Sequence, residues 1–348
     1  MHVRLSRWRL AGIGAAVVVL ALAALLTLRS GSTPAVTAAG ASFASGRTVT
    51  DLARAPWYGL RLLIDPLRFS EPPEPARSQP RIDAEAGILV DLDARTVLWQ
   101  HNAHEELAPA STIKLLTAMV VLENYRPDAL ITVTQDALGQ AGDETKMYLK
   151  AGDRMTVAEL LTGLLTVSAN DAADALAVDT VGTERFVAAM NGQAAALGLH
   201  QTHATSPVGL DDPRMHSSAY DLAVLAGIDV TQWPLVRQIV GTRYAVIPGT
   251  AVHGTFYMTN LNLLLSMYPA ATGLKTGYTG NAGSCLVGMA ARNGHHLISV
   301  VLNSSAYIYS QTRKLLDWGF VQDGLPSQLP TPSPSPSHAP PAPASPHH

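Results

Sequence analysis

The stretch PASTIK (residues 109–114) opens the apolar run LLTAMVVLE, and the rest of the chain is best understood from it. The run predicts a helix that is buried on nearly every side. Ser111 and Lys114 are three residues apart, so in a helix they share one face and the hydroxyl lies within reach of the amine. Pro109 suits a first helical turn, where its missing N–H would have no partner. The serine is thus expected at the positive end of a helix dipole, which suits a nucleophile.

A serine hydroxyl needs a neighbour that takes its proton, and a neutral lysine can do this. The chain has 5 lysines and 19 arginines, so arginine is its usual cation. Arginine stays protonated in proteins, whereas a buried lysine can lose its charge. Lys114 is therefore a candidate base for Ser111, although S-x-x-K alone also occurs by chance on solvated helix faces.

Two further motifs follow in order along the chain. SAN (168–170) comes after the apolar run ELLTGLLTV, and KTG (275–277) comes after ATGL. The order S-x-x-K, S-x-N, K-T-G resembles the signature of penicillin-binding proteins and class A β-lactamases. From about residue 84 to 320 the sequence is similar to the serine D-Ala-D-Ala carboxypeptidases, the low-molecular-mass penicillin-binding proteins. The resemblance implies the β-lactamase/transpeptidase-like fold and covalent inhibition by β-lactam antibiotics.

The SAN motif offers two groups that suit the chemistry of a serine acyl-enzyme. The Ser168 hydroxyl could relay a proton between Lys114 and a leaving amine. The Asn170 amide can bind a substrate carbonyl and a lysine ammonium at once. A simpler alternative is that this segment only caps the helix that follows, a role common for Ser and Asn.

The KTG motif is expected to bind substrate. Lys275 would bring a second cation near Lys114, lower the pKa of that amine, and attract the free carboxylate of a peptide terminus. Thr276 adds a hydroxyl for the same carboxylate, and Gly277 leaves room for substrate to lie along the strand edge. The family resemblance further implies that the backbone N–H groups of Ser111 and Tyr278 form the oxyanion hole.

The patterning predicts an α+β domain, an antiparallel sheet covered by helices. Residues 87–93 and 96–99 are expected to form two strands joined by a turn. Residues 284–291 and 297–302 are expected to form a hairpin of buried strands, and residues 311–320 a closing helix. Between them, from Ser111 to about Ala196, the apolar spacing is mostly helical.

The N-terminal region predicts a membrane anchor followed by a tether. A basic tail (1–9) precedes an apolar run (10–28) close to the roughly 20 residues that span a bilayer, which would put the rest of the chain outside the cytoplasm. A cleaved signal peptide and a secreted protein are the alternative. Residues 29–80 are predicted to be a Ser/Thr/Pro-rich tether, 81–323 the catalytic domain, and 324–348 a disordered Pro/Ser-rich tail.

Composition argues against other classes of function. The net charge of −3 gives no reason to expect nucleic acid. No metal or other cofactor is expected, because the histidine pairs lack an obvious ligand set. Cys285 is the single cysteine, so no internal disulfide is possible.

The sequence therefore predicts a membrane-tethered serine D,D-carboxypeptidase that removes the terminal D-alanine from peptidoglycan stem pentapeptides through an acyl-enzyme on Ser111. The alternatives are a D,D-endopeptidase or a weak β-lactamase using the same residues, and a catalytically silent wall-binding domain. The last glutamate is Glu184, so the loop glutamate that deacylates class A β-lactamases has no counterpart, and rapid β-lactam hydrolysis is disfavoured. The family's carboxylate-binding arginine is also missing from its usual place, which leaves Lys275 with Thr276, or Arg313, for that role.

Overall fold

The computed structural model describes residues 67–71, 79–140, 145–304 and 307–329. Its central element is a five-stranded antiparallel sheet with strand order β2-β1-β9-β8-β7, as expected for an α+β domain. The strands are β1 (Ala84–Asp91), β2 (Thr96–His101), β7 (Ala271–Thr279), β8 (Gly283–Arg292) and β9 (His295–Ser304). The two predicted hairpins are β1–β2 and β8–β9, and β7 is an edge strand.

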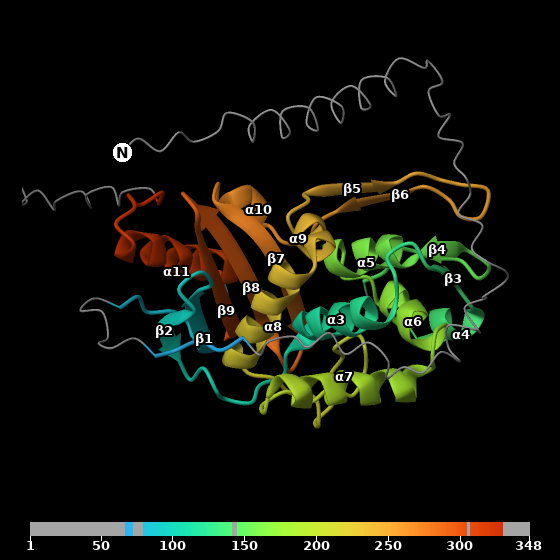
Figure 1. The fold of residues 1–348 in the computed structure, drawn as a ribbon, viewed down its shortest axis with the longest axis horizontal. Helices are drawn as coiled ribbons and strands as arrows, with labels where there is room; N and C mark the ends of the chain where they lie inside the picture. The colour runs from blue at the N-terminus through green and yellow to red at the C-terminus, as the bar shows by residue number, and fades with distance from the viewer. Residues whose placement is uncertain (1–66, 72–78, 141–144, 305–306, 330–348) are drawn as a thin grey trace, which may run out of the picture. The chain divides into compact units, whose positions relative to one another are not determined.

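Helices cover both faces of this sheet, which explains why β8 and β9 are continuous apolar runs and do not alternate. Leu286, Leu297 and Val301 pack with α11 (Ile308–Gln322), the predicted closing helix. Val287 and Val300 belong to the larger core on the other face. Figure 1 shows α11 on one side of the sheet and α8 (Ala219–Gln232) on the other.

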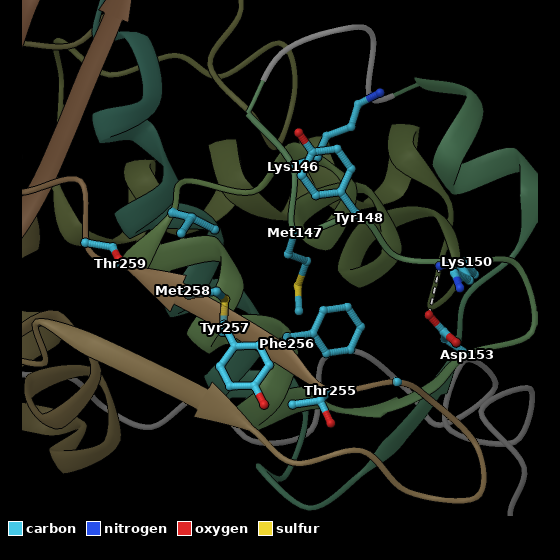
Figure 2. Close-up of a pocket in the computed structure, with 12 residues that line it drawn as sticks. Lys146, Met147, Tyr148, Lys150, Asp153, Thr255, Phe256, Tyr257, Met258 and Thr259 are labelled. Atoms are coloured by element: carbon cyan, nitrogen blue, oxygen red, sulfur yellow. Dashed lines mark hydrogen bonds between the residues drawn. The ribbon is translucent and has the colours of Figure 1, made fainter.

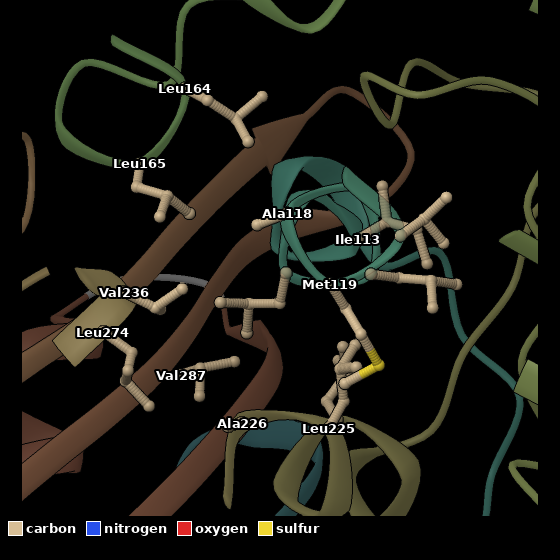
Figure 3. Close-up of a cluster of buried hydrophobic side chains, with 14 of the residues drawn as sticks. Ile113, Ala118, Met119, Leu164, Leu165, Leu225, Ala226, Val236, Leu274 and Val287 are labelled. Atoms are coloured by element: carbon tan, nitrogen blue, oxygen red, sulfur yellow. The ribbon is translucent and has the colours of Figure 1, made fainter. Parts of the chain in front are cut away.

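The larger core is built around α3 (Lys114–Asn124), which begins at the lysine of the opening motif. Every residue from Lys114 to Val121 is buried, as the apolar run predicts. Figure 3 shows Ala118 and Met119 of α3 surrounded by side chains from other helices and from β7 and β8. The surrounding helices include α5 (Val157–Thr166), α6 (Asn170–Val178), α7 (Thr183–Leu197) and α9 (Pro234–Val240).

Smaller elements complete the helical side. Two antiparallel pairs are formed by β3 (Leu130–Thr132) with β4 (Arg154–Thr156) and by β5 (Tyr244–Ile247) with β6 (Phe256–Thr259). The remaining short elements are η1 (Ala110–Ile113), α4 (Gln135–Gln140) and α10 (Leu264–Met267).

Residues on either side of the predicted catalytic domain, 81–323, also pack on the described fold. Leu67 and Phe69 are buried in the larger core, and the Ser70 and Val97 backbones share a hydrogen bond. At the other end, Ser327 Oγ donates to Asp317 at 2.5 Å. A few apolar residues inside a Ser/Pro-rich stretch can pack on a domain without any periodicity, so the sequence does not indicate these contacts.

The predicted anchor at residues 10–28 lies outside the described residues, as do the basic tail and most of the tether and the C-terminal tail. Within the described part of the chain, no helix combines the length and the apolar character needed to span a bilayer.

Candidate active site

Ser111 lies in η1, the single 3₁₀ turn that leads into α3. Side chains three residues apart are eclipsed in a 3₁₀ helix, so Ser111 and Lys114 lie on the same face. Lys114 Nζ lies 2.9 Å from Ser111 Oγ. On its other side, Ser111 Oγ donates to the carbonyl of Val208 at 3.4 Å. The nucleophile turn is therefore held between a buried amine and a neighbouring loop.

Lys114 is fully buried and its Nζ faces four oxygen atoms. Two of them are hydroxyls, Ser111 Oγ and Ser168 Oγ, the latter at 3.2 Å. The other two can only accept: the Ser168 carbonyl at 3.0 Å and Asn170 Oδ1 at 2.5 Å. A neutral amine has two N–H groups for these two acceptors, so its lone pair is left for a hydroxyl proton. The arrangement suits Lys114 as the base for Ser111.

The SAN turn that supplies these oxygens follows α5, a helix whose start is fixed by a capping box between Thr156 and Glu159. Ser168 has φ of 58°, a left-handed conformation that turns the chain sharply before α6. The N-cap of α6 is Ala169, with no side-chain cap. The alternative in which this segment only caps a helix is therefore wrong: Asn170 directs its amide oxygen to Lys114.

The Asp171 side chain connects the SAN turn to the segment 145–149. Its carboxylate accepts from the backbone N–H groups of Met147 and Leu149, both at 3.0 Å. The Asn170 N–H donates to the Thr145 carbonyl at 2.8 Å. These hydrogen bonds attach the segment 145–149 to the first turn of α6, next to the site.

The KTG motif lies on the edge strand β7. Lys275 is 1% exposed and donates to the Thr276 carbonyl at 2.8 Å. Burial, and then the charge of Lys114, hold the pKa of Lys275 well below its usual value. Lys114 is therefore close enough to Lys275 for the two side chains to interact electrostatically.

Gly277 lies close to the turn that carries Ser111. A Cβ at this position would lie 3.0 Å from the Ala110 Cβ and from the Ser111 backbone nitrogen. The missing side chain therefore makes room for the nucleophile turn itself. This close approach places the backbone of β7 beside the N–H of Ser111, where the oxyanion hole was expected. Tyr278, whose backbone N–H is the other expected donor, has an exposed side chain.

The loop behind Ser111 contributes groups that sequence reasoning missed. Gly209 has φ of 87°, and a Cβ there would lie 2.2 Å from the Ala110 carbonyl oxygen. Thr117 Oγ donates to the Pro207 carbonyl at 2.7 Å. Nothing in the composition of the segment SPVG (206–209) indicates that it supports the turn that carries Ser111.

Asp174, in α6, is a buried carboxylate. It is 3% exposed, and its Oδ2 has no hydrogen-bond partner among the described residues. Burial raises its pKa to about 7, partly offset by the charge of Lys114. Arg313, the other candidate for carboxylate binding, donates to the Met267 carbonyl at 3.5 Å.

One cluster elsewhere has the atom types of a cation site. Asp91, His295 and Asp323 bring one ligand atom each within 4.8 Å of one another. The Asp91 carboxylate already accepts from the N–H groups of Asp93 and Ala94, and His295 Nδ1 lies 3.4 Å from Asp323 Oδ2. A turn and an ion pair therefore account for these side chains.

Taken together, an antiparallel sheet flanked by helices and a Ser-Lys-Ser-Asn cluster facing a Lys-Thr-Gly edge strand define a serine acyl-transfer protein of the penicillin-binding class. The family model described as D-alanyl-D-alanine carboxypeptidase matches residues 74–306. The chain belongs to this family.

Individual relatives agree with this assignment. The chain is 38% identical to the D-alanyl-D-alanine carboxypeptidase DacB2 of Mycobacterium tuberculosis over 71% of this chain and 86% of the relative. It is 32% identical to DacF of Bacillus subtilis, over 76% and 69% of the two chains.

Solved structures are similar as well. A D-alanyl-D-alanine carboxypeptidase from Mycobacterium tuberculosis superposes with a TM-score of 0.67 at 36% identity, covering 71% of this chain and 96% of that one. The DD-transpeptidase of Streptomyces K15 superposes with a TM-score of 0.66 at 32% identity, covering 70% and 99%.

Proposed function

We propose that this protein is a serine D-Ala-D-Ala carboxypeptidase that removes the terminal D-alanine from peptidoglycan stem pentapeptides. The observation that carries the proposal is the contact of 2.9 Å between Lys114 Nζ and Ser111 Oγ, inside a cluster whose two acceptors, the Ser168 carbonyl and Asn170 Oδ1, match the two N–H groups that a neutral amine would have. Membership of the carboxypeptidase family supports the same reaction.

In the acylation step, Ser111 Oγ bonds to the carbonyl carbon of the penultimate D-alanine while its proton passes to Lys114. The carbonyl oxygen becomes an oxyanion and accepts from the backbone N–H groups of Ser111 and Tyr278. The peptide C–N bond then breaks, and the leaving nitrogen takes its proton from Lys114 through the Ser168 hydroxyl. The products of this step are free D-alanine and an ester on Ser111.

In the second step, water attacks the ester and gives its proton to Lys114. The C–O bond to Ser111 breaks, the proton returns to Oγ, and the shortened peptide is released. The same groups therefore act as base and then as acid in each half of the reaction.

Substrate recognition is assigned to the two sides of the cleft. Lys275 and Thr276 hold the terminal carboxylate, and the Asn170 amide binds a substrate carbonyl. Burial lowers the pKa of Lys275, and the negative charge of a carboxylate bound beside it would favour the protonated amine, so the ion pair would form as substrate binds. The low exposure of Lys275 supports this role.

β-Lactams are expected to acylate Ser111 and to leave slowly. In the loop where a deacylating glutamate would be needed, the sequence has only Asp211 and Asp212 as carboxylates. Asp212 pairs with Arg214 at 2.8 Å, which lowers the pKa of Asp212 to about 2. A carboxylate with such a low pKa is a poor base for activating water.

The experiment is labelling of the full-length chain with a fluorescent penicillin. We expect stable labelling that is lost in Ser111→Ala and retained in a control, Ser266→Ala, because Ser266 is an exposed serine of α10. D-Alanine release from a synthetic pentapeptide should follow the same pattern. Rapid loss of the label would support a weak β-lactamase, and no label with no turnover would support a silent wall-binding domain.

We further propose that residues 10–28 keep the protein in the cell membrane with its catalytic domain outside the cytoplasm. The apolar run and its basic flank support this placement. Sequencing of the mature N-terminus and fractionation of cells test it. A protein that begins near Ser42 and is found in the medium would contradict the anchor and favour secretion.

A further inference from the structure

Exposed apolar side chains cover the outer face of the β5–β6 pair. Val246 of β5 lies directly opposite Tyr257 of β6, and Tyr244 is two residues before Val246, so these three side chains share one face. The two tyrosines are 72% and 80% exposed, and Val246 is exposed as well. On the other face, Ile247 and Met258 are buried in the larger core. The inner face therefore explains how the pair is held, and the outer face has no such role in the fold.

The apolar surface continues past β6 toward α10. The Asn260 N–H donates to the Arg243 carbonyl at 2.8 Å, which keeps the segment after β6 beside the start of β5. Figure 1 shows β5, β6 and α10 along one edge of the fold. The exposed large side chains of this region, here called the hairpin surface, are Tyr244, Val246, Tyr257, Leu261, Leu263 and Met267.

The stretch of sequence that builds the hairpin surface contains no acidic residue. The chain has 27 Asp and Glu residues, and none occurs between Asp229 and Asp317. Two exposed arginines of this stretch lie next to the hairpin: Arg237 on α9 and Arg243 directly before β5. The surface is therefore apolar with positive charge beside it.

Further cations lie at both ends of the surface. Arg313 of α11 donates to a backbone carbonyl of α10 at 3.5 Å. At the other end, Lys146 and Lys150 line a pocket beside β6, and Figure 2 shows the ring of Tyr257 next to this pocket. Asp153 also lines the pocket and accepts from the Lys150 backbone N–H at 2.8 Å. Positive charge thus dominates the rim of the hairpin surface.

A bilayer that contains anionic phospholipids matches both properties of this surface. Tyrosine rings are favoured at the level of the headgroups, and aliphatic side chains are favoured at the boundary with the acyl chains. Arginine and lysine side chains next to them are attracted by the negative surface potential. A soluble polyanion would match the cations but would leave the exposed Val, Leu and Met side chains in water.

We propose that the hairpin surface docks the catalytic domain onto a membrane that contains anionic phospholipids. This contact is separate from the apolar run at residues 10–28, and it determines which side of the domain faces the bilayer. A flexible tether alone leaves that orientation open. The inference depends neither on that run nor on the reaction proposed for Ser111.

The test is hydroxyl-radical footprinting of the full-length chain in lipid nanodiscs. The radicals oxidise exposed Tyr and Met side chains, and mass spectrometry measures the oxidation of each residue. In discs of phosphatidylglycerol we expect the oxidation of Tyr244, Tyr257 and Met267 to fall about threefold or more relative to discs of phosphatidylcholine, because side chains in the interfacial region lose contact with water.

Tyr278 is an internal control in the same samples. It is 73% exposed and lies on β7. This strand starts beside α9, since a Cβ on Gly241 would lie 3.2 Å from the Thr272 carbonyl oxygen. At about 3.3 Å per residue, Tyr278 is roughly 20 Å further along the strand. Its oxidation should be the same in both kinds of disc.

Two double variants separate the charged and the apolar parts of the contact. Arg237→Gln with Arg243→Gln should remove most of the protection, and high salt should do the same. Val246→Ser with Leu263→Ser keeps every charge and should also weaken the protection, because less apolar surface is buried. Arg185→Gln is the matched control: it removes an exposed cation of α7, at the opposite edge of the fold in Figure 1, and should have no effect.

Several results would overturn the proposal. One is equal oxidation in the two kinds of disc, and another is protection that the arginine substitutions leave unchanged. Protection that grows with protein concentration in phosphatidylcholine discs would identify a second copy of the chain as the partner, against the membrane. Protection by soluble polyphosphate would show that charge alone is recognised, which also contradicts the proposal. Penicillin labelling of the same samples tests Ser111 separately, so the two proposals can fail independently.

Discussion

The backbone nitrogen of Ser111 would lie 3.0 Å from a methyl group placed on Gly277. The turn η1, which carries Ser111, and the edge strand β7 therefore pack so closely that position 277 has little room for a side chain. We predict that Gly277→Ala widens this gap by a few tenths of an ångström and slows acylation by roughly 10- to 100-fold, because oxyanion donors act only in precise geometry. The second-order rate of labelling by fluorescent penicillin measures the effect.

Gly280→Ala is the matched control for this change. The nearest atom to a Cβ at position 280 is Asp211 Oδ2 at 4.0 Å, so the added methyl group has space. Equal acylation rates for the two alanine variants would show that the close approach at position 277 is unimportant. Thermal unfolding of both proteins separates a local shift from a loss of folding.

Lys114→Arg is expected to abolish acylation although it keeps a positive charge. A guanidinium cannot give up its proton in a protein, so it cannot accept one from Ser111. We expect a loss of about 10²- to 10⁴-fold in the acylation rate, the usual contribution of general base catalysis. Lys314→Arg, on an exposed part of α11, should behave as wild type. A fully active Lys114→Arg protein would refute the role of the amine as a base.

Asp171→Ala should destabilise the fold and disturb the segment 145–149 next to the site. The change leaves the buried N–H groups of Met147 and Leu149 without their acceptor, at a cost of about 1–3 kcal/mol each. Denaturant unfolding would measure this loss. Asp171→Asn keeps one acceptor oxygen and should lose less, so similar losses in the two variants would contradict the assignment.

The buried carboxyl group of Asp174 should make the free energy of unfolding depend on pH. Its pKa is about 7 in the folded protein and near 3.8 when exposed, so folding binds a proton between these values. Burial of this carboxyl group therefore costs no stability below about pH 4, where it is protonated in both states. The loss in free energy of unfolding grows as pH rises to about 7. Asp174→Asn should raise the free energy of unfolding by roughly 1–4 kcal/mol at pH 8, with little effect near pH 4.

The control for that experiment is Asp136→Asn, at an exposed position in the first turn of α4. Its unfolding free energy should follow that of the wild type across the pH range. If Asp174→Asn were no more stable than wild type at pH 8, burial of a charged carboxylate at this position would be disproved.

Much of the architecture was predictable because local patterns and tertiary structure agree. The apolar runs that became β8 and β9 needed no information beyond their own residues, and the spacing of Ser111 and Lys114 fixed their contact. The SAN motif could be connected to Lys114 only by resemblance, since its approach depends on how α5 and α6 pack on α3.

Features created by two distant segments were not predictable. The constraint on Gly277 exists only because η1 lies against β7, and the hydrogen bonds between Asp171 and the segment 145–149 join residues more than 20 positions apart. Likewise, the burial of Asp174 follows from helix packing and is not indicated by its position in the sequence. Packing of Phe69 on the core also has no periodic signal in a Ser/Pro-rich region.

Cys285 is the single thiol of the chain, and it lies in β8 with 2% of its surface exposed. Burial raises its pKa to about 11, so it stays protonated and unreactive at neutral pH. The native protein therefore already provides a silent background for maleimide chemistry. Fluorophores or spin labels attached to introduced surface cysteines would report on opening of the cleft without first removing a natural residue.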